Sequence, residues 1–530
     1  MKMFASMKKV SALSLAALLL VSSLTGCGSA KATPKGNTQQ ASSSGNTPAG
    51  KSKADTSKEV NLSMYLWGSA SVDNAFVMET LNKRLKEKIN ATLEIKYIPW
   101  DAIATKYPLI FASGEAYDLV YTSITANPTY FSLAEKKAFQ PLDELLPVYA
   151  PETWKKTPQD LWADAKFNGK IYGIPSRYTE YIPGGLVYRG DLLKKYGMQP
   201  LASLGDVQTY FENILKNEKG MTPWMANSSK AADLYGMFVD FTGTWLKVPS
   251  VDISTMYLAA NSKDDIKNVF HPAFTNEFLQ FAKRMKEWSD KGFWTKDVLS
   301  TKNDPSTEFN SGKGAAYFHH AQGFVGWYGN LLQAQPNSDP QFFTFGDATK
   351  KVVKTRTMQN ATAFSANSKN VERSLMLVDL LMNNKEFYDL FHFGIEGRNY
   401  ALNGDGKRVN PANFDAKKNG YGQSGWNLRT DELEIQVATD YPERKSMNKQ
   451  YDAFSIKDPF SNFNFDSKNV ASELAAVNQV NSQIGVQILF GKAGDPEAAV
   501  ESYRSKLKAA GIEKIIAEVK KQIENYQPVK

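Results

Sequence analysis

Hydrophobic and polar residues alternate where the folded part of the chain begins. Over residues 60–66 every second residue is apolar, and the residues between them are polar or aromatic. A period of two predicts a strand that ends near Trp67. Beyond a short loop, Val77, Leu81 and Leu85 recur every fourth residue. That spacing predicts an amphipathic helix after the strand.

The patterns that follow indicate the fold class. Apolar residues near 93–97 and a run at 119–121 predict two more strands, and the segment near 101–113 between them is predicted to be helical. Strand–helix–strand–helix–strand at this spacing favours an α/β lobe with a mostly parallel sheet. Further helices are predicted at 191–196, 206–218, 275–291, 370–391, from Asp495-Pro496 to a stop at Gly511, and along the apolar stripe that begins at Ile512.

The N-terminal end indicates export. Three lysines precede a 12-residue apolar stretch at 10–21, which is too short to span a bilayer and has the length of a signal-peptide core. Leu24-Thr25-Gly26-Cys27 then resembles a bacterial lipobox, which predicts that residues 1–26 are removed and that Cys27 carries the lipid anchor. An ordinary secretory signal followed by a chance cysteine is the alternative. The predicted location is the extracytoplasmic face of the cell membrane.

Cysteine content, charge and composition narrow the classes of function. Cys27 is the only cysteine, so an acylated chain has no thiol left for a disulfide, a metal site or a nucleophile. Residues 27–58 are predicted to be the lipidated cysteine and a flexible linker, because 28–58 lack aromatic residues, leucine, isoleucine and valine. The net charge of +8 falls to +5 without the three lysines of the signal peptide, and no basic block interleaved with aromatics suggests nucleic acid. Residues 59–530 are too many for one small core, so two or more lobes are expected.

Several segments, in order, resemble one family. Gly169–Ser176 (GKIYGIPS), Gly185–Met198 (GLVYRGDLLKKYGM), Phe309–Ala316 (FNSGKGAA) and Gly394–Tyr400 (GIEGRNY) resemble family 1 extracellular solute-binding proteins of ABC importers. The last motif is similar to one in the larger lipoproteins of the Bacillus and Paenibacillus type, the LipO-like or YtcQ/LplA-like group. The tail from about Phe460 resembles their C-terminal domain of unknown function.

This resemblance implies a two-lobe, periplasmic-binding-protein-like α/β fold of type II with hinge strands and a helical C-terminal extension. Lobe one would take 59–176 and about 363–400, and lobe two about 177–362 and 401–530. The crossings near Pro175 and Ala361 would be hinges. The implied function is to capture a carbohydrate between the lobes and to deliver it to ABC permease subunits. Whether the sugar is neutral or acidic stays open.

Candidate ligand-binding residues come from aromatic content and from the family pattern. The chain has ten tryptophans, and flat rings can stack on the apolar faces of sugars. Trp67 ends the first strand, and Trp327 matches a stacking position of the family. Core packing, or ion pairs between the lobes, is the alternative for any of the candidates. The predicted set is Trp67, Gly68, Ser69, Arg177, Tyr178, Glu180, Trp224, Trp245, Gln322, Trp327, Glu396, Arg398, Tyr400 and Trp426.

Catalytic and metal-binding signals are weak. The chain contains neither His-Glu-x-x-His nor Gly-x-Ser-x-Gly. His319 and His320 are adjacent, so their side chains are expected to diverge rather than to share a metal. We therefore expect a monomeric binding protein without cofactor or metal, and not an enzyme. Two alternatives stay open: a cell-surface glycoside hydrolase or polysaccharide lyase, whose carboxylates pair only in space, and a ligand-sensing lipoprotein.

Overall fold

The computed structural model describes residues 55–251, 253–423 and 425–528. The predicted signal peptide, Cys27 and most of the linker lie outside the described residues. Within the described part, no helix combines the length and the apolar character that crossing a membrane requires.

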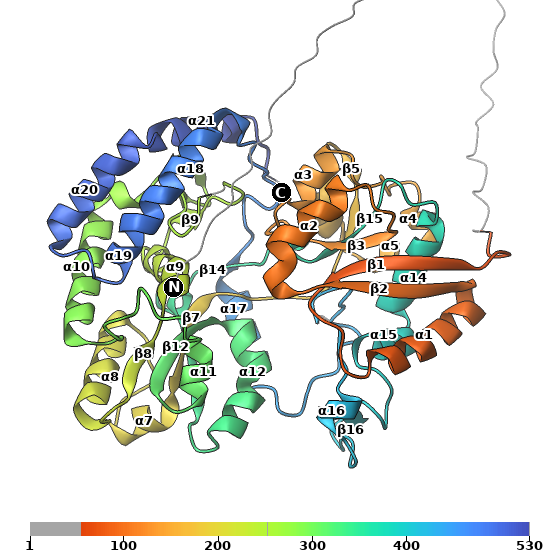
Figure 1. The fold of residues 1–530 in the computed structure, drawn as a ribbon, viewed down its shortest axis with the longest axis horizontal. Helices are drawn as coiled ribbons and strands as arrows, with labels where there is room; N and C mark the ends of the chain where they lie inside the picture. The colour runs from red at the N-terminus through yellow and green to blue at the C-terminus, as the bar shows by residue number, and fades with distance from the viewer. Residues whose placement is uncertain (1–54, 252, 424, 529–530) are drawn as a thin grey trace, which may run out of the picture. The chain divides into compact units, whose positions relative to one another are not determined.

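A five-stranded sheet organises the first lobe (Figure 1). Its strand order is β2-β1-β3-β15-β6, and β15 alone runs antiparallel to its neighbours. The predicted alternation of the first strand is confirmed, because Leu62, Met64 and Leu66 are buried on one face. The strands are β1 (Val60–Trp67), β2 (Ala91–Ile98), β3 (Leu119–Thr122), β15 (Ala361–Phe364) and β6 (Gly173–Pro175).

The first-lobe helices follow the predicted order with one difference. Helix α1 buries Val77, Leu81 and Leu85, as its spacing predicts. The single helix expected at 370–391 is two helices, because Asn384 takes an extended conformation and its side chain caps the second one. The helices are α1 (Asn74–Ile89), α2 (Ile103–Ala112), α3 (Tyr130–Glu135), α4 (Leu146–Tyr149), α5 (Pro151–Lys156), α6 (Gln159–Ala165), α14 (Val371–Asn383) and α15 (Lys385–His392). Short strands β4 (Lys166–Phe167) and β5 (Lys170–Ile171) complete this part.

A four-stranded sheet, β13-β7-β12-β8, organises the second lobe. Its strands are β7 (Gly184–Arg189), β8 (Thr222–Met225), β12 (Gly314–His320) and β13 (Pro340–Thr344), with a three-stranded sheet of β9 (Leu246–Lys247), β10 (Ala259–Ser262) and β11 (Asp265–Phe270) beside it. Its helices are α7 (Gly190–Lys195), α8 (Leu204–Asn217), α9 (Ala231–Phe241), α10 (Asn276–Lys291), α11 (Pro305–Asn310), α12 (Ala321–Ala334) and α13 (Phe345–Thr349).

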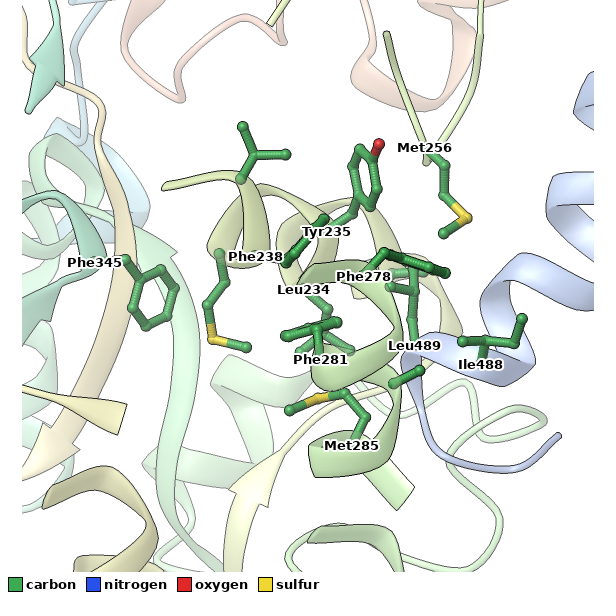
Figure 2. Packing of buried hydrophobic residues seen from close by; sticks show 14 of the residues in the cluster. Leu234, Tyr235, Phe238, Met256, Phe278, Phe281, Met285, Phe345, Ile488 and Leu489 are labelled. Atoms are coloured by element: carbon green, nitrogen blue, oxygen red, sulfur yellow. The ribbon is translucent and has the colours of Figure 1, made fainter. Parts of the chain in front are cut away.

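The C-terminal helices share the hydrophobic core of the second lobe. Figure 2 shows Leu489 next to Met285 of α10, and Ile488 belongs to the same core. The apolar stripes of the last two helices are buried in the same core, as expected; their residues there are Val500, Tyr503, Leu507, Ile512, Ile515, Val519 and Ile523. These elements are α18 (Ala471–Val480), a π-helical turn (Asn481–Gly485), α19 (Val486–Leu489), α20 (Pro496–Ala509) and α21 (Ile512–Glu524).

The predicted start and stop of α20 are confirmed. The Asp495 side chain accepts a hydrogen bond from the backbone N–H of Ala498 at 2.9 Å, directly before the proline at the first helical position. Gly511 has a φ of 90°, a conformation that favours glycine, and it ends the helix.

The predicted hinge residues lie side by side. Pro175 in β6 is the register partner of Ala361 in β15, so the two crossings leave the first sheet next to each other. The predicted lobe boundaries place a third crossing near residue 400, but the structure places it later. Residues near 401–436 stay with the first lobe, and the chain returns to the second lobe only at α17 (Arg444–Phe454) and β18 (Ser455–Ile456), which pairs with β14 (Val352–Val353).

The placement of residues after 400 therefore differs from the predicted assignment of 401–530 to lobe two. Leu428 is buried in the first hydrophobic core, and Tyr421 and Trp426 pack against it. Burial of these apolar side chains holds the segment on the first lobe, although no periodic pattern marks it in the sequence. A small hairpin of β16 (Ala401–Leu402) and β17 (Arg408–Val409) and the short α16 (Ala416–Asn419) belong to the same segment.

The last residues of the predicted linker also contact the first lobe. The Asn90 side chain donates a hydrogen bond to the Thr56 carbonyl at 2.9 Å. The Arg373 guanidinium donates to the carbonyl of Asp55. Residues 55–58 are thus held against the lobe.

Candidate ligand-binding site

A cavity of about 580 Å³ lies among side chains of both lobes. On the first lobe, Trp67 is the last residue of β1, Trp100 follows β2, and Tyr121 belongs to β3. On the second lobe, the wall is the end of β12 and the first turns of α12. Ligands of open α/β sheets bind outside the carboxyl ends of strands. The lining residues are Trp67, Trp100, Tyr121, Tyr178, Glu180, His319, His320, Gln322, Gly323, Gly326, Trp327, Gln359, Asn360, Gly425, Trp426 and Arg429.

Four tryptophans give the cavity its aromatic surfaces. The Trp100 ring lies 6.4 Å from the ring of Trp67 and 5.6 Å from that of Trp426, measured between centroids. Trp100 is 57% exposed and Trp327, from the second lobe, is 44% exposed. Single exposed apolar side chains are ordinary, but exposed rings that gather on one cavity mark a surface for a ligand or partner.

The loop after β1 positions Trp67. Gly68 has a φ of 116°, which a residue with a Cβ rarely adopts, and its N–H donates to the carbonyl of Ile98 at 2.8 Å. This bond joins the ends of β1 and β2, so Trp67 and Trp100 lie together. Sequence reasoning finds Gly68 for its loop position, and its role is to fix the backbone beside Trp67.

A polar network forms another wall. The Tyr178 hydroxyl donates to Glu180 Oε2 at 3.1 Å. The Asn360 amide donates to the Tyr178 hydroxyl at 2.8 Å and to Glu180 Oε2 at 3.3 Å, and its oxygen accepts from the Tyr121 hydroxyl at 2.6 Å. Burial raises the pKa of Glu180 above its usual range, while the Tyr178 hydroxyl, Arg429 and Asn360 act in the opposite direction. The network holds a carboxylate and an amide in fixed positions at the cavity.

Two histidines support the tryptophan of the second lobe. The expectation that His319 and His320 diverge is wrong, because their ring centroids are 4.5 Å apart. The His320 ring caps α12, since its Nδ1 accepts from the Gly323 N–H at 3.1 Å. The His319 ring lies 4.4 Å from the Trp327 ring, edge to face. Burial lowers the pKa of His319 and lowers that of His320 to about 4.

Gly323 makes this arrangement of rings feasible. A Cβ at this position would lie 2.0 Å from the His319 ring, so only glycine leaves room for the imidazole. Among the described residues, no group of three or more His, Cys, Asp and Glu side chains is placed to hold a metal ion.

The structure brings together six of the predicted site residues at the cavity: Trp67, Tyr178, Glu180, Gln322, Trp327 and Trp426. Two predicted tryptophans lie elsewhere. Trp224 is 2% exposed in the second core, between Phe211 and Trp288. Trp245 packs against Phe238 and Phe270 at a different surface. Neither tryptophan lines the cavity.

The predicted charged residues outside the cavity have structural partners. The Arg177 side chain is 4% exposed and donates to the Asn383 side chain at 2.8 Å, within the first lobe. Arg398 forms two hydrogen bonds with Asp73, at 2.7 and 2.8 Å. Both arginines thus make structural contacts, but these contacts lie within the first lobe and are not the ion pairs between the lobes that formed the alternative.

The remaining predicted residues also lie off the cavity wall. Tyr400 is buried in a small cluster with Tyr388 and Phe393. The backbone of Glu396 pairs with that of Tyr400 in the Gly-flanked turn. Ser69 is exposed just beyond Gly68.

Sequence reasoning misses several lining residues. Trp100 directly follows the second predicted strand, so the strand-end argument used for Trp67 would have found it. Asn360 and Arg429 carry no local signal, because they reach the cavity only through the crossing at β15 and the late return of the chain to the second lobe.

Comparisons with known proteins relate this geometry to a family. The sequence profile described as "Bacterial extracellular solute-binding protein" matches residues 70–386. A second profile, described as a domain of unknown function (DUF3502), matches residues 459–528 and confirms the prediction for the tail.

Two curated relatives share sequence with this chain. A carbohydrate ABC transporter substrate-binding protein of Streptococcus pneumoniae serotype 4 is 26% identical over 531 residues, which cover 98% of each chain. Lipoprotein LipO of Bacillus subtilis strain 168 is 24% identical over 344 residues, which cover 60% of this chain and 64% of LipO.

Solved structures share the fold. The N-glycan transport solute-binding protein of S. pneumoniae has a TM-score of 0.72 at 22% identity, covering 88% of this chain and 99% of that one. The alginate-binding protein AlgQ2 without calcium ion has a TM-score of 0.61 at 18% identity, covering 89% and 100%. These likenesses confirm the predicted two-lobe α/β fold.

Proposed function

Since this chain belongs to the family of bacterial extracellular solute-binding proteins, we propose that it captures an oligosaccharide between its two lobes and delivers it to an ABC importer. The observation that carries the proposal is the cavity of about 580 Å³ with open tryptophan rings from both lobes. Trp100 offers a ring from the first lobe and Trp327 one from the second.

The chemistry of the cavity suits a sugar. Its tryptophan faces match the apolar C–H faces of pyranose rings, and burial of one such side chain contributes about 1.5–3 kcal/mol. Glu180, Asn360 and Gln322 supply acceptors and donors for hydroxyl groups. The relative from S. pneumoniae is itself described as a carbohydrate ABC transporter substrate-binding protein, which supports the same class of ligand.

The proposed mechanism is ligand-linked closure. A sugar that contacts Trp100 and Trp327 at once binds the closed form better than an open one, so it shifts the equilibrium towards closure. The adjacent crossings at Pro175 and Ala361 would let the lobes rotate as rigid bodies. Permease subunits would then recognise the closed form.

We further propose that the protein is a monomer, held at the extracytoplasmic face of the membrane by a lipid on Cys27, and that it performs no catalysis. Hydrolysis of a glycoside uses two carboxyl groups about 5–10 Å apart. Glu180 is the one carboxylate that lines the cavity in the described part of the chain. That favours binding over a hydrolase. A sensing lipoprotein would use the same cavity with a different partner.

A thermal-shift screen tests the proposed function. The purified protein, from residue 28 onward, is heated with a panel of plant and bacterial oligosaccharides. A ligand at a hundred times its Kd stabilises the folded state by about 2.7 kcal/mol, which raises Tm by several degrees. We expect at least one oligosaccharide to do so, and the same sugar to remain intact after incubation.

Two controls separate the alternatives. Trp327→Ala should reduce the shift produced by the same sugar. Uptake of that sugar by cells that lack the gene distinguishes transport from sensing. Cells without a transport receptor do not accumulate the sugar, whereas cells without a sensor still contain the importer and its own receptor. A panel that leaves Tm unchanged, or sugars that are cleaved, would contradict the proposal.

A further inference from the structure

The charges around the cavity bear on which class of sugar it accepts. In the described part of the chain, four lining residues have ionisable acidic or basic side chains other than tyrosine: Glu180, Arg429, His319 and His320. Burial lowers the pKa of both His319 and His320, so neither imidazole supplies a cation at pH 7.

Arg429 is already neutralised by the protein. Its guanidinium lies 3.6 Å from the Asp431 carboxylate and 3.7 Å from the Glu434 carboxylate. One of its nitrogens donates to the Gly425 carbonyl at 3.2 Å, and the group stacks 4.6 Å from the centroid of the Tyr178 ring. The side chain is 9% exposed. Glu434 also lies 3.5 Å from the Arg408 guanidinium. Two guanidinium groups and two carboxylates therefore balance in charge here, which leaves no excess positive charge for a ligand.

Glu180, in contrast, has no cationic partner within 4 Å among the described residues. Its Oε2 accepts hydrogen bonds from Tyr178 and Asn360, two uncharged groups. Its Oε1 accepts none from the described residues, and Glu180 lines the cavity. The Oε1 atom of this partly buried carboxylate is a strong acceptor for a hydroxyl group, because hydrogen bonds to an ionised acceptor are about twice as strong as neutral ones.

From these contacts, and resting on the proposed function, we infer that the cavity selects neutral oligosaccharides and rejects uronates, with Glu180 as the selecting residue. A neutral sugar donates a hydroxyl hydrogen to Oε1 of Glu180. A uronate brings a second carboxylate into the same partly buried space, where like charges repel and where no unpaired cation lines the cavity in the described part of the chain. The selection therefore includes a repulsive element as well as an attractive one.

The experiment compares sugars of matched length at pH 7. Titration calorimetry measures binding of neutral galacto-, manno- and chito-oligosaccharides, and of oligogalacturonate and oligomannuronate, to the wild-type protein. We expect at least one neutral probe to bind, and the uronates to bind at least tenfold more weakly. Uronate binding that is tighter than that of every neutral probe would overturn the inference while leaving the proposed function intact. If no probe of either class binds, the proposed function fails and the inference fails with it.

Two variants test the role of Glu180. Glu180→Gln keeps the shape and removes the charge, so affinity for the neutral probe should fall about tenfold or more, and the preference over uronates should shrink by at least as much. Glu180→Asp keeps the charge on a shorter side chain, so it should still reject uronates even where its affinity for the neutral probe is lower. Preference for neutral sugars that is unchanged in Glu180→Gln would overturn the assignment.

Glu79→Gln is the matched control. Glu79 lies on the exposed face of α1, so this variant loses the same charge away from the cavity and should bind like wild type. Thermal unfolding of each variant shows that it is folded before its affinities are compared. A loss of discrimination in Glu79→Gln equal to that in Glu180→Gln would mean that net charge, not Glu180, selects the sugar.

Discussion

The tryptophans of the cavity differ in how much of each ring the protein covers. The Trp67 ring packs edge to face against Tyr107 and Tyr121, with centroids 5.4 and 4.8 Å away. Trp327 contacts mainly the His319 ring and is 44% exposed. Trp67 therefore contributes to the first core as well as to the cavity, whereas Trp327 is largely free for a ligand.

Trp327→Ala should accordingly weaken sugar binding by about 1–3 kcal/mol, roughly 5- to 150-fold, without lowering the Tm of the ligand-free protein. Trp67→Ala should weaken binding and also lower that Tm, because it removes a packed ring. Titration calorimetry and scanning calorimetry separate the two effects. Leu215→Ala, at a 42% exposed leucine on α8, is the control and should change neither. Equal affinity of Trp327→Ala and wild type would remove this ring from the site.

The ionised Glu180 side chain is expected to lower the free energy of unfolding of the ligand-free protein. Burial raises its pKa in the folded protein, so the folded state binds this proton more tightly than the unfolded state does. Stability from this group is therefore greatest at low pH and falls as pH rises through the window between the unfolded and folded pKa values. Glu180→Gln should raise the Tm of the ligand-free protein at pH 7, and should flatten its pH dependence between pH 4 and pH 7 relative to Glu79→Gln. A lower Tm for Glu180→Gln would contradict this.

Some of these site residues could be predicted from the sequence, and others could not. Trp67 is predictable because a strand of period two ends there, and Glu180 because it follows a crossing. Trp224 is one of the aromatic residues predicted for the site, yet tertiary packing places it in the second core. Local pattern identifies an element and its end, but only long-range packing decides which side chains at those ends face a common space.

Helix α12 depends on close contact between its first turn and the preceding strand. His320 caps it, and Gly323 leaves the space that the His319 ring fills next to Trp327. The sequence predicts neither the cap nor the ring contact, because the side chains of adjacent residues in a strand are expected to point in different directions. The strand ends at His320 and the helix begins at Ala321, so the chain turns directly after the two histidines.

Gly323→Ala should therefore displace the His319 ring and, with it, Trp327. We expect sugar affinity to fall at least fivefold, although alanine is the better helix former by about 1 kcal/mol. Gly236→Ala is a matched control inside α9, where the nearest atom to the new Cβ is the Tyr257 hydroxyl at 3.6 Å, an ordinary contact. It should keep wild-type affinity. Equal sugar affinities of Gly323→Ala and Gly236→Ala would contradict the role of Gly323 in placing His319 and Trp327.

The two helices in place of the one expected at 370–391 show a second limit of sequence reasoning. Asn384 lies in a run of residues with good helical spacing, so periodicity alone continues the helix. Its side chain instead accepts hydrogen bonds from the N–H groups of Glu386 and Phe387 and restarts the chain as α15. Asparagine can either continue or cap a helix, and the packing of both helices on the first core decides between the two.

Attachment to the membrane concerns the whole exported chain. The folded part begins to contact the first lobe at Asp55, and the predicted lipid site at Cys27 precedes it by a segment without the apolar residues needed for a core. Cys27→Ser should release the protein from membranes into the medium, since the single acylable thiol is lost. Partition into the detergent phase after phase separation measures this. A wild-type level of membrane retention in the variant would contradict the lipoprotein assignment.

The proposed closure would involve both lobes and the three crossings between them. Trp100 and Trp327 belong to different lobes, so a ligand that stacks on both gains its full binding energy only when the lobes approach. Saturation with a sugar that binds should therefore compact the wild-type protein in solution scattering, because hinge closure is a rigid-body motion. Trp327→Ala should need roughly 5- to 150-fold more of the same sugar to reach the compact form, since it loses about 1–3 kcal/mol of the contact that favours closure. Leu215→Ala should close at the wild-type concentration. A scattering profile that saturating sugar leaves unchanged would show that binding occurs without closure, and the permease would then need another signal to recognise the loaded protein.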